Sequence, residues 1–257
     1  MYWIIENNLF KEPFYDKLLP FLDRLDIPYE TNRVIPFGGG FLEEPKPTEE
    51  NIIVMGSYSM TVEAIKRGWI PGAFTNENYD YPIWSKEWGD KCLNYPATVS
   101  KFGEVAKQDD LFFIRPCLDD KQFTGQIMDW EEFAEWQKKV IDLRETYTTL
   151  DYDTEVLVSE PKKIEAEYRF IVVDKKIVTG SLYKQGQTVL YQECNDPEIY
   201  QFVQETADIW TPARGVAIDV CVHDGKLWVL EMGNMNAAGL YDCDVQKVVM
   251  ALEDMRF

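Results

Sequence analysis

The sequence predicts a globular protein of mixed α and β structure, with a small α/β domain at the N-terminus and a second domain after residues 90–105. Three observations predict this class. The 257 residues are 46% hydrophobic and 14% aromatic, which is enough for one large core or two modest ones. Apolar runs of strand length alternate with helical patterns in the first part of the chain. Strand patterns joined by short turns fill most of the last part.

The first domain alternates strands with helices. Strands are predicted at three runs, residues 2–5, 27–30 and 51–56. The spacing of apolar residues predicts helices over Phe14–Leu25 and Val62–Arg67. We expect Pro20 to end or kink the first helix, because proline removes a backbone donor, and we expect Gly68 to end the second. This β-α-β-β-α order predicts a parallel or mixed sheet.

Glycine and aromatic residues characterise the remainder of the first domain. The run Phe37–Phe41 holds three glycines but lacks the order of a phosphate-binding loop, so it predicts a flexible loop. The backbone at Gly56-Ser57 fits a phosphate site and a plain strand-to-helix turn equally well. Residues 69–100 are rich in Pro, Tyr, Trp and Asn and predict an irregular connection packed by aromatic side chains.

The second domain begins with a strand pattern at residues 110–116, followed by a helix that Asp129 caps. Further strand patterns lie at residues 155–161, 164–173 and 177–184. Asn195 or Asp196 caps the next predicted helix, which has Pro197 in its first turn. An Asp-Gly turn then joins the two apolar strands of a hairpin, residues 215–222 and 227–236.

Two acidic residues interrupt this last hairpin. Asp219 lies within its first strand, Glu231 closes its second strand, and Asn234 and Asn236 follow. A buried carboxylate is costly unless a cation meets it, and carboxylate and amide oxygens suit a hard divalent cation such as Mg²⁺. A surface hairpin whose acids face water explains the same spacing about equally well.

Basic residues are scarce inside the apolar segments. Arg115 closes the first strand of the second domain and Lys121 lies in the loop after it, so together they could hold a phosphate chain. The alternative is an Arg–Asp network at the surface of this loop. Glu167 and Arg169 share one face of their predicted strand, and Lys184 ends the partner strand.

Composition excludes several classes of partner. The 45 acidic residues against 26 basic ones give a net charge of -19, which disfavours nucleic acid and anionic membranes. We find no apolar run of membrane-spanning length and no signal-peptide pattern. The five scattered cysteines predict reduced core residues in a cytoplasmic protein without a zinc site. The single histidine, His223, falls in the hairpin turn, so histidine-based catalysis is not expected.

The ordered set of a strand ending in a cation and proline, a Glu-x-Arg strand, and an Asp and Glu on the last hairpin resembles the ATP-grasp superfamily of carboxylate–amine ligases. It looks most like the branch of ribosomal-protein glutamyl ligases and uncharacterised phage and bacterial proteins, over roughly residues 100–245. The resemblance implies an ATP-grasp domain over residues 101–257, in which two α+β subdomains grip the nucleotide. A Rossmann-like pre-ATP-grasp domain would occupy residues 1–100.

The resemblance implies roles for the nucleotide-binding residues. Arg115 stands where the family has a lysine and would neutralise ATP phosphates together with Lys121. The hinge, whose backbone pairs with adenine, would be formed by Val158, Ser159 and Glu160. Glu167 matches the position that holds the ribose hydroxyls.

It also implies catalytic residues and metal ligands. Arg169 would lie near the transferred phosphate, and Lys184 would contact the anionic intermediate. Asp219 and Glu231 match the magnesium ligands. Relatives carry Glu-x-Asn, whereas Gly233 stands at the asparagine position here, so we expect Asn236, or else Asn234, to supply the missing oxygen.

The function implied is an ATP- and Mg²⁺-dependent ligase that joins a carboxylate to an amine or thiol through an acyl-phosphate. Its substrates would be small molecules or peptides, and the sequence says nothing of oligomeric state. Asp219→Asn or Glu231→Gln is expected to abolish turnover and leave the fold intact. Three alternatives stay open: a phosphotransferase on the same scaffold, a nucleotide-binding module without turnover, and an acidic interaction protein.

Overall fold

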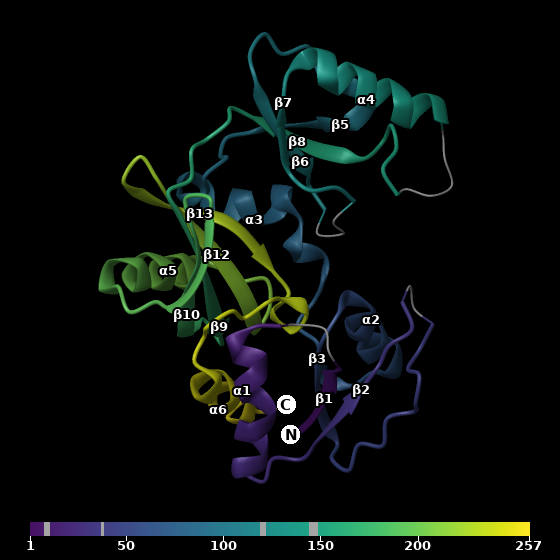
Figure 1. The fold of residues 1–257 in the computed structure, drawn as a ribbon, viewed down its shortest axis with the longest axis vertical. Coiled ribbons are helices and arrows are strands. Elements are labelled where there is room, and N and C mark those ends of the chain that lie inside the picture. Colours follow the sequence, from purple (N-terminus) through teal and green to yellow (C-terminus); the bar gives the residue numbers. More distant parts are fainter. Residues whose placement is uncertain (8–10, 37–38, 119–121, 144–148) are drawn as a thin grey trace. The chain divides into compact units, whose positions relative to one another are not determined.

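The computed structural model describes the chain except residues 8–10, 37–38, 119–121 and 144–148 (Figure 1). The described chain forms two compact units, one of residues 1–76 with 164–257 and one of residues 77–163. The predicted domains, residues 1–100 and 101–257, divide the chain elsewhere and stay a prediction.

The elements of the two units are as follows. The strands of the first unit are β1 (Tyr2–Glu6), β2 (Tyr29–Asn32), β3 (Asn51–Met55), β4 (Ile70–Gly72), β9 (Ala166–Val173), β10 (Lys176–Gln185), β11 (Thr188–Glu193), β12 (Gly215–His223) and β13 (Lys226–Gly233). Its helices are α1 (Pro13–Arg24), α2 (Tyr58–Arg67), α5 (Pro197–Ile209), the short 3-10 helix η4 (Met235–Ala237) and α6 (Val245–Glu253). The second unit holds β5 (Thr98–Lys101), β6 (Phe112–Pro116), β7 (Gln126–Met128), β8 (Glu155–Ser159), α3 (Tyr81–Trp88), α4 (Trp130–Leu143) and three short helices, η1 (Glu77–Tyr79), η2 (Gly89–Lys91) and η3 (Phe102–Glu104).

The N-terminal strands form a four-stranded parallel sheet in the order β2-β1-β3-β4, within the predicted choice of a parallel or mixed sheet. Helix α1 runs through Pro20 to Arg24, so the expected end at Pro20 is wrong. Its apolar face is buried in the core through Phe14, Leu18 and Leu22, and this burial offsets the backbone hydrogen bond that proline removes.

A five-stranded antiparallel sheet in the order β11-β10-β9-β12-β13 forms the larger part of the first unit. Helix α5 packs against it, with the ring of Tyr200 meeting the ring of Phe170 edge-on at 5.1 Å between centroids (Figure 1). Asp196 caps this helix as predicted, because its carboxylate accepts a hydrogen bond from the Glu198 N–H at 2.9 Å.

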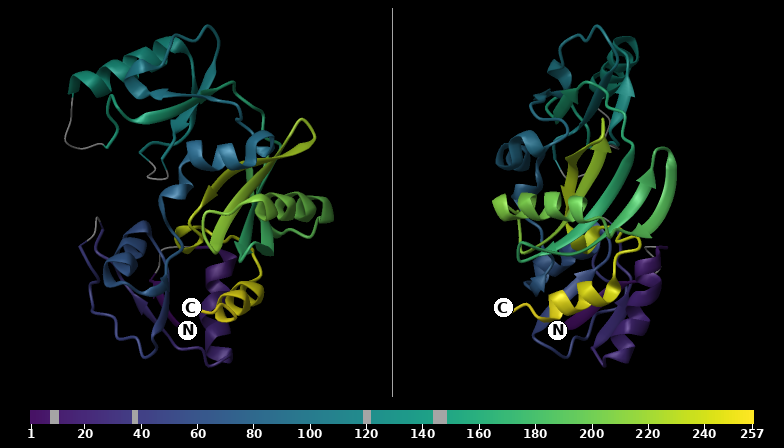
Figure 2. Two further views of the ribbon diagram at one scale, coloured as in Figure 1. Left: turned by 180° about the vertical axis from the view of Figure 1, so that it is seen from behind. Right: turned by 90° about the vertical axis from the view of Figure 1, so that its left-hand side faces the viewer.

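One hydrophobic core joins the two ends of the chain. Trp3 and Leu18 from the N-terminus are buried in the same cluster as Val248 and Leu252 from α6, together with Ile171 of the five-stranded sheet. The N-terminal amino group also lies 3.0 Å from the Glu253 carboxylate, so the two termini lie close together (Figure 2). The N-terminal sheet therefore shares its core with the C-terminal segment.

The second unit is a four-stranded antiparallel sheet in the order β5-β8-β6-β7, with α4 beside it (Figure 2). Asp129 caps α4 as predicted, accepting from the Glu132 N–H at 2.9 Å, and Phe133 packs into the core of this unit. The prediction of an irregular connection over residues 69–100 is wrong over Tyr81–Trp88, where α3 buries Trp84 and Trp88. Aromatic residues decide this segment, because they pack a helix as well as they pack a loop.

All five cysteines are free and buried, as predicted. Burial raises the pKa of the Cys92 thiol to about 12, which keeps it protonated at neutral pH. None of the described helices combines the length and the apolar character that a membrane crossing requires.

Candidate active site

Strand pairing places three charged residues side by side in the middle of the five-stranded sheet. Asp219 on β12 pairs with Arg169 on β9 and with Glu231 on β13. Residues directly opposite each other in a sheet point to the same face. Nε and Nη2 of Arg169 each donate a hydrogen bond of 2.7 Å to one oxygen of Asp219. Asp219 is only 3% exposed, so the alternative of acids facing water is wrong for this residue.

Burial sets the electrostatics of this pair. It raises the pKa of the Asp219 carboxyl, and the Arg169 guanidinium opposes that rise only in part. Burial also acts to lower the pKa of Arg169, but the Asp219 carboxylate more than compensates and leaves that pKa well above its ordinary value. Because arginine keeps its charge at neutral pH and both Asp219 oxygens accept from it, the pair is an ion pair.

A second charged pair lies next to the first. Lys184 on β10 is opposite Glu167 on β9, and its Nζ donates to Glu167 Oε1 at 2.7 Å. Glu167 is two residues before Arg169, so their side chains share a face of β9, as the sequence predicts. The structure therefore brings five predicted site residues together on one face: Glu167, Arg169, Lys184, Asp219 and Glu231.

Tyr183 connects the two pairs, and the sequence analysis missed it. Its hydroxyl donates to Glu167 Oε2 at 2.8 Å and lies 3.3 Å from Asp219 Oδ2. In a regular strand Tyr183 and Lys184 would point to opposite faces. A β-bulge between Leu182 and Lys184 inserts Tyr183 as an extra residue and turns both side chains toward Glu167. No local pattern in the sequence predicts this bulge.

Stacked tyrosine rings line the same region. The ring of Tyr241 stacks on Tyr183 at 4.7 Å and on Tyr191 at 5.1 Å between centroids. The Arg169 guanidinium lies 5.0 Å from the centre of the Tyr241 ring, within the range of a cation–π contact. Arg169 Nη1 also donates to the Gly239 carbonyl at 2.9 Å. Arg169 is thus held by a carboxylate, a carbonyl and an aromatic wall.

The two candidate amide ligands are engaged in structural hydrogen bonds. Asn236 is fully buried; its Oδ1 accepts from the Phe74 N–H at 2.8 Å and its Nδ2 donates to the Val54 carbonyl at 2.8 Å. Asn234 Oδ1 accepts from the Asn236 N–H at 2.9 Å. Both amides therefore fasten the end of β13 to the N-terminal part of the chain, and their role as metal ligands stays a prediction.

Gly233 has room for a side chain. It pairs with Ala217, and a Cβ built on it would meet nothing within 4 Å. Because it lies two residues after Glu231 on the same strand, a side chain here would point to the face of Glu231. The glycine is therefore not required by packing.

The other predicted nucleotide-binding residues belong to the second unit. Arg115 on β6 pairs with Leu157 on β8, next to Val158. Val158, Ser159 and Glu160 line a pocket of about 410 Å³ together with Pro96, Ala97, Thr98, Gln108 and Lys162. Lys162 was not predicted; its Nζ lies 3.3 Å from Asn94 Oδ1. Lys121 lies outside the described residues, as does part of the loop proposed to hold phosphate with it.

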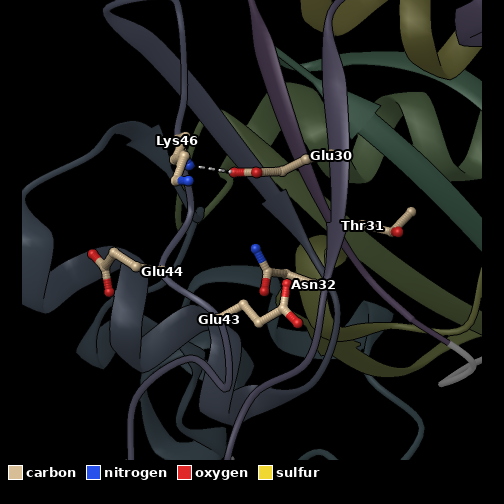
Figure 3. Close-up of a pocket in the computed structure, with 6 residues that line it drawn as sticks. All are labelled: Glu30, Thr31, Asn32, Glu43, Glu44 and Lys46. Atoms are coloured by element: carbon tan, nitrogen blue, oxygen red, sulfur yellow. Dashed lines mark hydrogen bonds between the residues drawn. The ribbon is translucent and has the colours of Figure 1, made fainter.

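Two further features concern the N-terminal sheet. The N–H groups of Gly56 and Ser57 donate to the Asn236 carbonyl and to Glu6 Oε2, at 2.8 and 2.6 Å, which favours the plain turn over the phosphate site. A pocket of about 520 Å³ lies beside β2, lined by Glu30, Thr31, Asn32, Glu43, Glu44 and Lys46 (Figure 3). Three carboxylates against one ammonium make this pocket better suited to a cationic group than to an anion.

The sequence matches a known protein family over more than half of its length. Residues 95–251 match the family model of an ATP-grasp domain, described as the second family of its clade. No curated protein matches the chain.

Several solved structures are similar over nearly the whole length of both chains. A D-alanine–D-alanine ligase from Bacillus anthracis has a TM-score of 0.58 and 15% identity, with 98% of this chain and 96% of that chain covered. The D-cycloserine synthetase DcsG has a TM-score of 0.60 and 12% identity, with 98% of each chain covered. The ATP-grasp ligase PsnB, complexed with a minimal precursor, has a TM-score of 0.55 and 11% identity, covering 98% and 97%. At these identities the likeness shows the fold.

Proposed function

The chain belongs to the ATP-grasp superfamily, and from this premise we propose that it is an ATP- and Mg²⁺-dependent ligase that joins a carboxylate to an amine or a thiol. The family match and the full-length likeness to ATP-grasp structures confirm the predicted superfamily and fold. The Rossmann-like character expected of the N-terminal part stays a prediction.

The observation that carries the proposal is the pairing of Asp219 with Glu231 on neighbouring strands, beside Arg169. Magnesium in phosphate-binding sites takes one or two protein carboxylates and completes its shell with phosphate oxygens and water. Among the described residues no group of three or more acidic, histidine or cysteine side chains is arranged to hold a metal ion. Two carboxylates with open neighbouring positions fit a magnesium–nucleotide complex better than a dedicated metal cage.

Each predicted residue has a place in this proposal. Asp219 and Glu231 would hold Mg²⁺, and Glu167 would accept hydrogen bonds from the ribose. Arg169 and Lys184 would face the transferred phosphate and the anionic intermediate. In the second unit, Arg115 would bind phosphate, as would Lys121. The backbone of Val158, Ser159 and Glu160 would bind adenine in the pocket that these residues line.

The chemistry asks the protein for positioning and charge. A substrate carboxylate oxygen attacks the γ-phosphorus of ATP, the bond to the β-phosphate oxygen breaks, and ADP leaves with the electron pair. The nucleophile then attacks the acyl carbon and releases phosphate. Mg²⁺ would offset the phosphate charge in the first step. Arg169, already oriented by Asp219, Gly239 and Tyr241, loses little conformational entropy when it meets the developing charge.

The similar structures favour ligation over the alternatives. Their names describe a D-alanine–D-alanine ligase, a D-cycloserine synthetase and a ligase complexed with a precursor, in one structure together with Mg and ADP. An amine acceptor would be compatible with the acidic pocket beside β2. We therefore propose amino acids or peptides as the substrate class.

ADP release in a pool of carboxylates and amines, with mass spectrometry of the product, tests the proposal. We expect release to require one compound of each kind. Release with a carboxylate alone and a phosphorylated product would make the protein a phosphotransferase. Nucleotide binding without release would make it a binding module, and absence of stabilisation by Mg-ATP would contradict the proposal outright.

Glu231→Gln is the variant of choice. Asp219→Asn would leave Arg169 buried opposite a neutral side chain, so it would confound activity with stability. We expect Glu231→Gln to lower ADP release at least about a hundredfold with little change in unfolding temperature. Asp224→Asn is the matched control, because Asp224 lies in the turn of the same hairpin at a φ of 50°, a conformation that asparagine tolerates.

A further inference from the structure

The hydroxyl of Tyr183 touches two carboxylates to which the proposed function gives different ligands. It is 2.8 Å from Glu167 Oε2, the proposed ribose acceptor, and 3.3 Å from Asp219 Oδ2, the proposed metal ligand. Lys184 holds the other oxygen of Glu167, and Arg169 holds both oxygens of Asp219. Among the described residues, Tyr183 is the one side chain for which hydrogen bonds to both acids are recorded.

We propose that Tyr183 is a positioning residue that couples metal binding at Asp219 to ribose binding at Glu167. This inference rests on the proposed function, because it takes the ligands of the two carboxylates from it. It adds that the two ligands bind cooperatively, and it names the side chain through which they do so.

The coupling follows from the single proton of a phenol. Tyr183 can donate fully to one acceptor at a time, so Glu167 and Asp219 compete for it. A cation at Asp219 draws electron density from that carboxylate and makes it the poorer acceptor. The proton is then left to Glu167, which is held by Lys184 on one oxygen and by Tyr183 on the other. A carboxylate fixed in this way is already oriented for the two ribose hydroxyls.

The structure holds the hydroxyl where this competition can occur. The β-bulge in β10 turns Tyr183 onto the charged face, and the stacked ring of Tyr241 fixes the plane of its ring. Burial raises the pKa of Tyr183, and Asp219 and Glu167 raise it further, so the phenol remains a donor at neutral pH. Asp219 and Glu167 have no other described tyrosine within hydrogen-bonding distance.

Tyr183→Phe tests the inference, with Tyr241→Phe as the matched control. Both variants keep an aromatic ring in the same stack, but the structure records no hydrogen bond for the Tyr241 hydroxyl within the described part of the chain. The measurement is the affinity for AMPPNP by titration calorimetry, with Mg²⁺ and with a chelator in its place. The ratio of the two dissociation constants is the coupling between metal and nucleotide.

We expect Mg²⁺ to strengthen AMPPNP binding about tenfold less in Tyr183→Phe than in the wild type, and equally in Tyr241→Phe and the wild type. A purely structural role of Tyr183 would lower the unfolding temperature and leave this ratio unchanged. Combining Tyr183→Phe with Glu167→Gln should add no further loss of coupling, because the acceptor of the shared proton is already changed.

The outcomes separate this inference from the function on which it rests. A wild-type protein that fails to bind AMPPNP with Mg²⁺ would overturn both. Tight, Mg²⁺-dependent binding with the same ratio in Tyr183→Phe would overturn the coupling and leave the proposed function standing. An equal loss of coupling in both phenylalanine variants would assign the effect to the ring stack and also overturn the role of the hydroxyl.

Discussion

Arg169 shows why single residues in this site are hard to assign separately. Three of its N–H groups are used, two by Asp219 and one by the Gly239 carbonyl, and its flat face contacts Tyr241. Removing either member of a buried ion pair strands the other, which typically costs about 3–5 kcal/mol. Variants of Arg169 and Asp219 therefore report on stability as well as on chemistry, unlike variants of Glu231.

Gly233 offers the opposite case, a position at which the family's side chain can be added. A Cβ placed there would meet nothing within 4 Å, and the position faces the same way as Glu231. We expect Gly233→Asn to fold normally and to lower the Mg²⁺ concentration needed for half-maximal AMPPNP binding by roughly threefold to tenfold, because an additional oxygen ligand strengthens a magnesium site.

The control for this prediction is Gly225→Asn in the turn of the same hairpin, where a Cβ also meets nothing within 4 Å. Glycine lies there at a φ of 67°, which asparagine adopts more readily than most residues. An unchanged Mg²⁺ requirement in a well-folded Gly233→Asn protein would show that position 233 does not face the metal.

At the scale of elements, the connection after β13 is held by Asn236. This side chain joins the N–H of Phe74 and the carbonyl of Val54 to the end of the hairpin, inside the core. We expect Asn236→Ala to destabilise the protein by about 3 kcal/mol in urea denaturation, because two buried backbone groups lose their partner. The exposed Asn195→Ala serves as the control and should change stability little.

The same variant tests the predicted role of Asn236 as a metal ligand. At a temperature where Asn236→Ala is fully folded, an Mg²⁺ requirement like that of the wild type would remove Asn236 from the ligand set. A higher Mg²⁺ midpoint for AMPPNP binding than in the wild type would support the prediction. A stability equal to that of the wild type would contradict the structural role.

Elements also show where sequence patterns succeed. The hairpin of β12 and β13, the Glu-x-Arg strand and the caps at Asp129 and Asp196 were predicted because each depends on neighbours in sequence. Helix α6 was missed, although Asp244 caps it and the apolar residues Val248, Val249 and Leu252 recur at helical spacing. Strand β11 gave no signal of burial because most of its side chains are exposed at the edge of the sheet.

At the scale of the whole molecule, the shared core bears on how the chain divides into domains. Trp3, Phe14 and Leu18 pack in one cluster with Val248 and Leu252, so residues 1–100 contain only part of the core that they help to build. We expect a fragment of residues 1–100 to show no cooperative thermal unfolding and poor dispersion in proton NMR spectra, whereas the full chain unfolds cooperatively and gives well-dispersed spectra.

A fragment that unfolds cooperatively would contradict this expectation and support the predicted domain boundary. Adding residues 164–257 as a separate chain provides a sharper version. If the shared core controls folding, the two fragments together should recover ordered structure that neither fragment has alone. Independent folding of the first fragment would make such recovery unnecessary.

The sequence by itself determined the superfamily, the last hairpin with its two acids, and the strand that carries Glu167 and Arg169, because these depend on residue type and short-range spacing. Only the tertiary structure decided which acid each cation meets, how Tyr183 reaches both Glu167 and Asp219, and that Asn236 is used inside the core. The physical reason is that strand register and β-bulges are fixed by contacts between distant segments, and the side chain of Asn236 likewise bonds to Val54, 182 residues away in the chain. Periodicity along one segment does not encode those contacts.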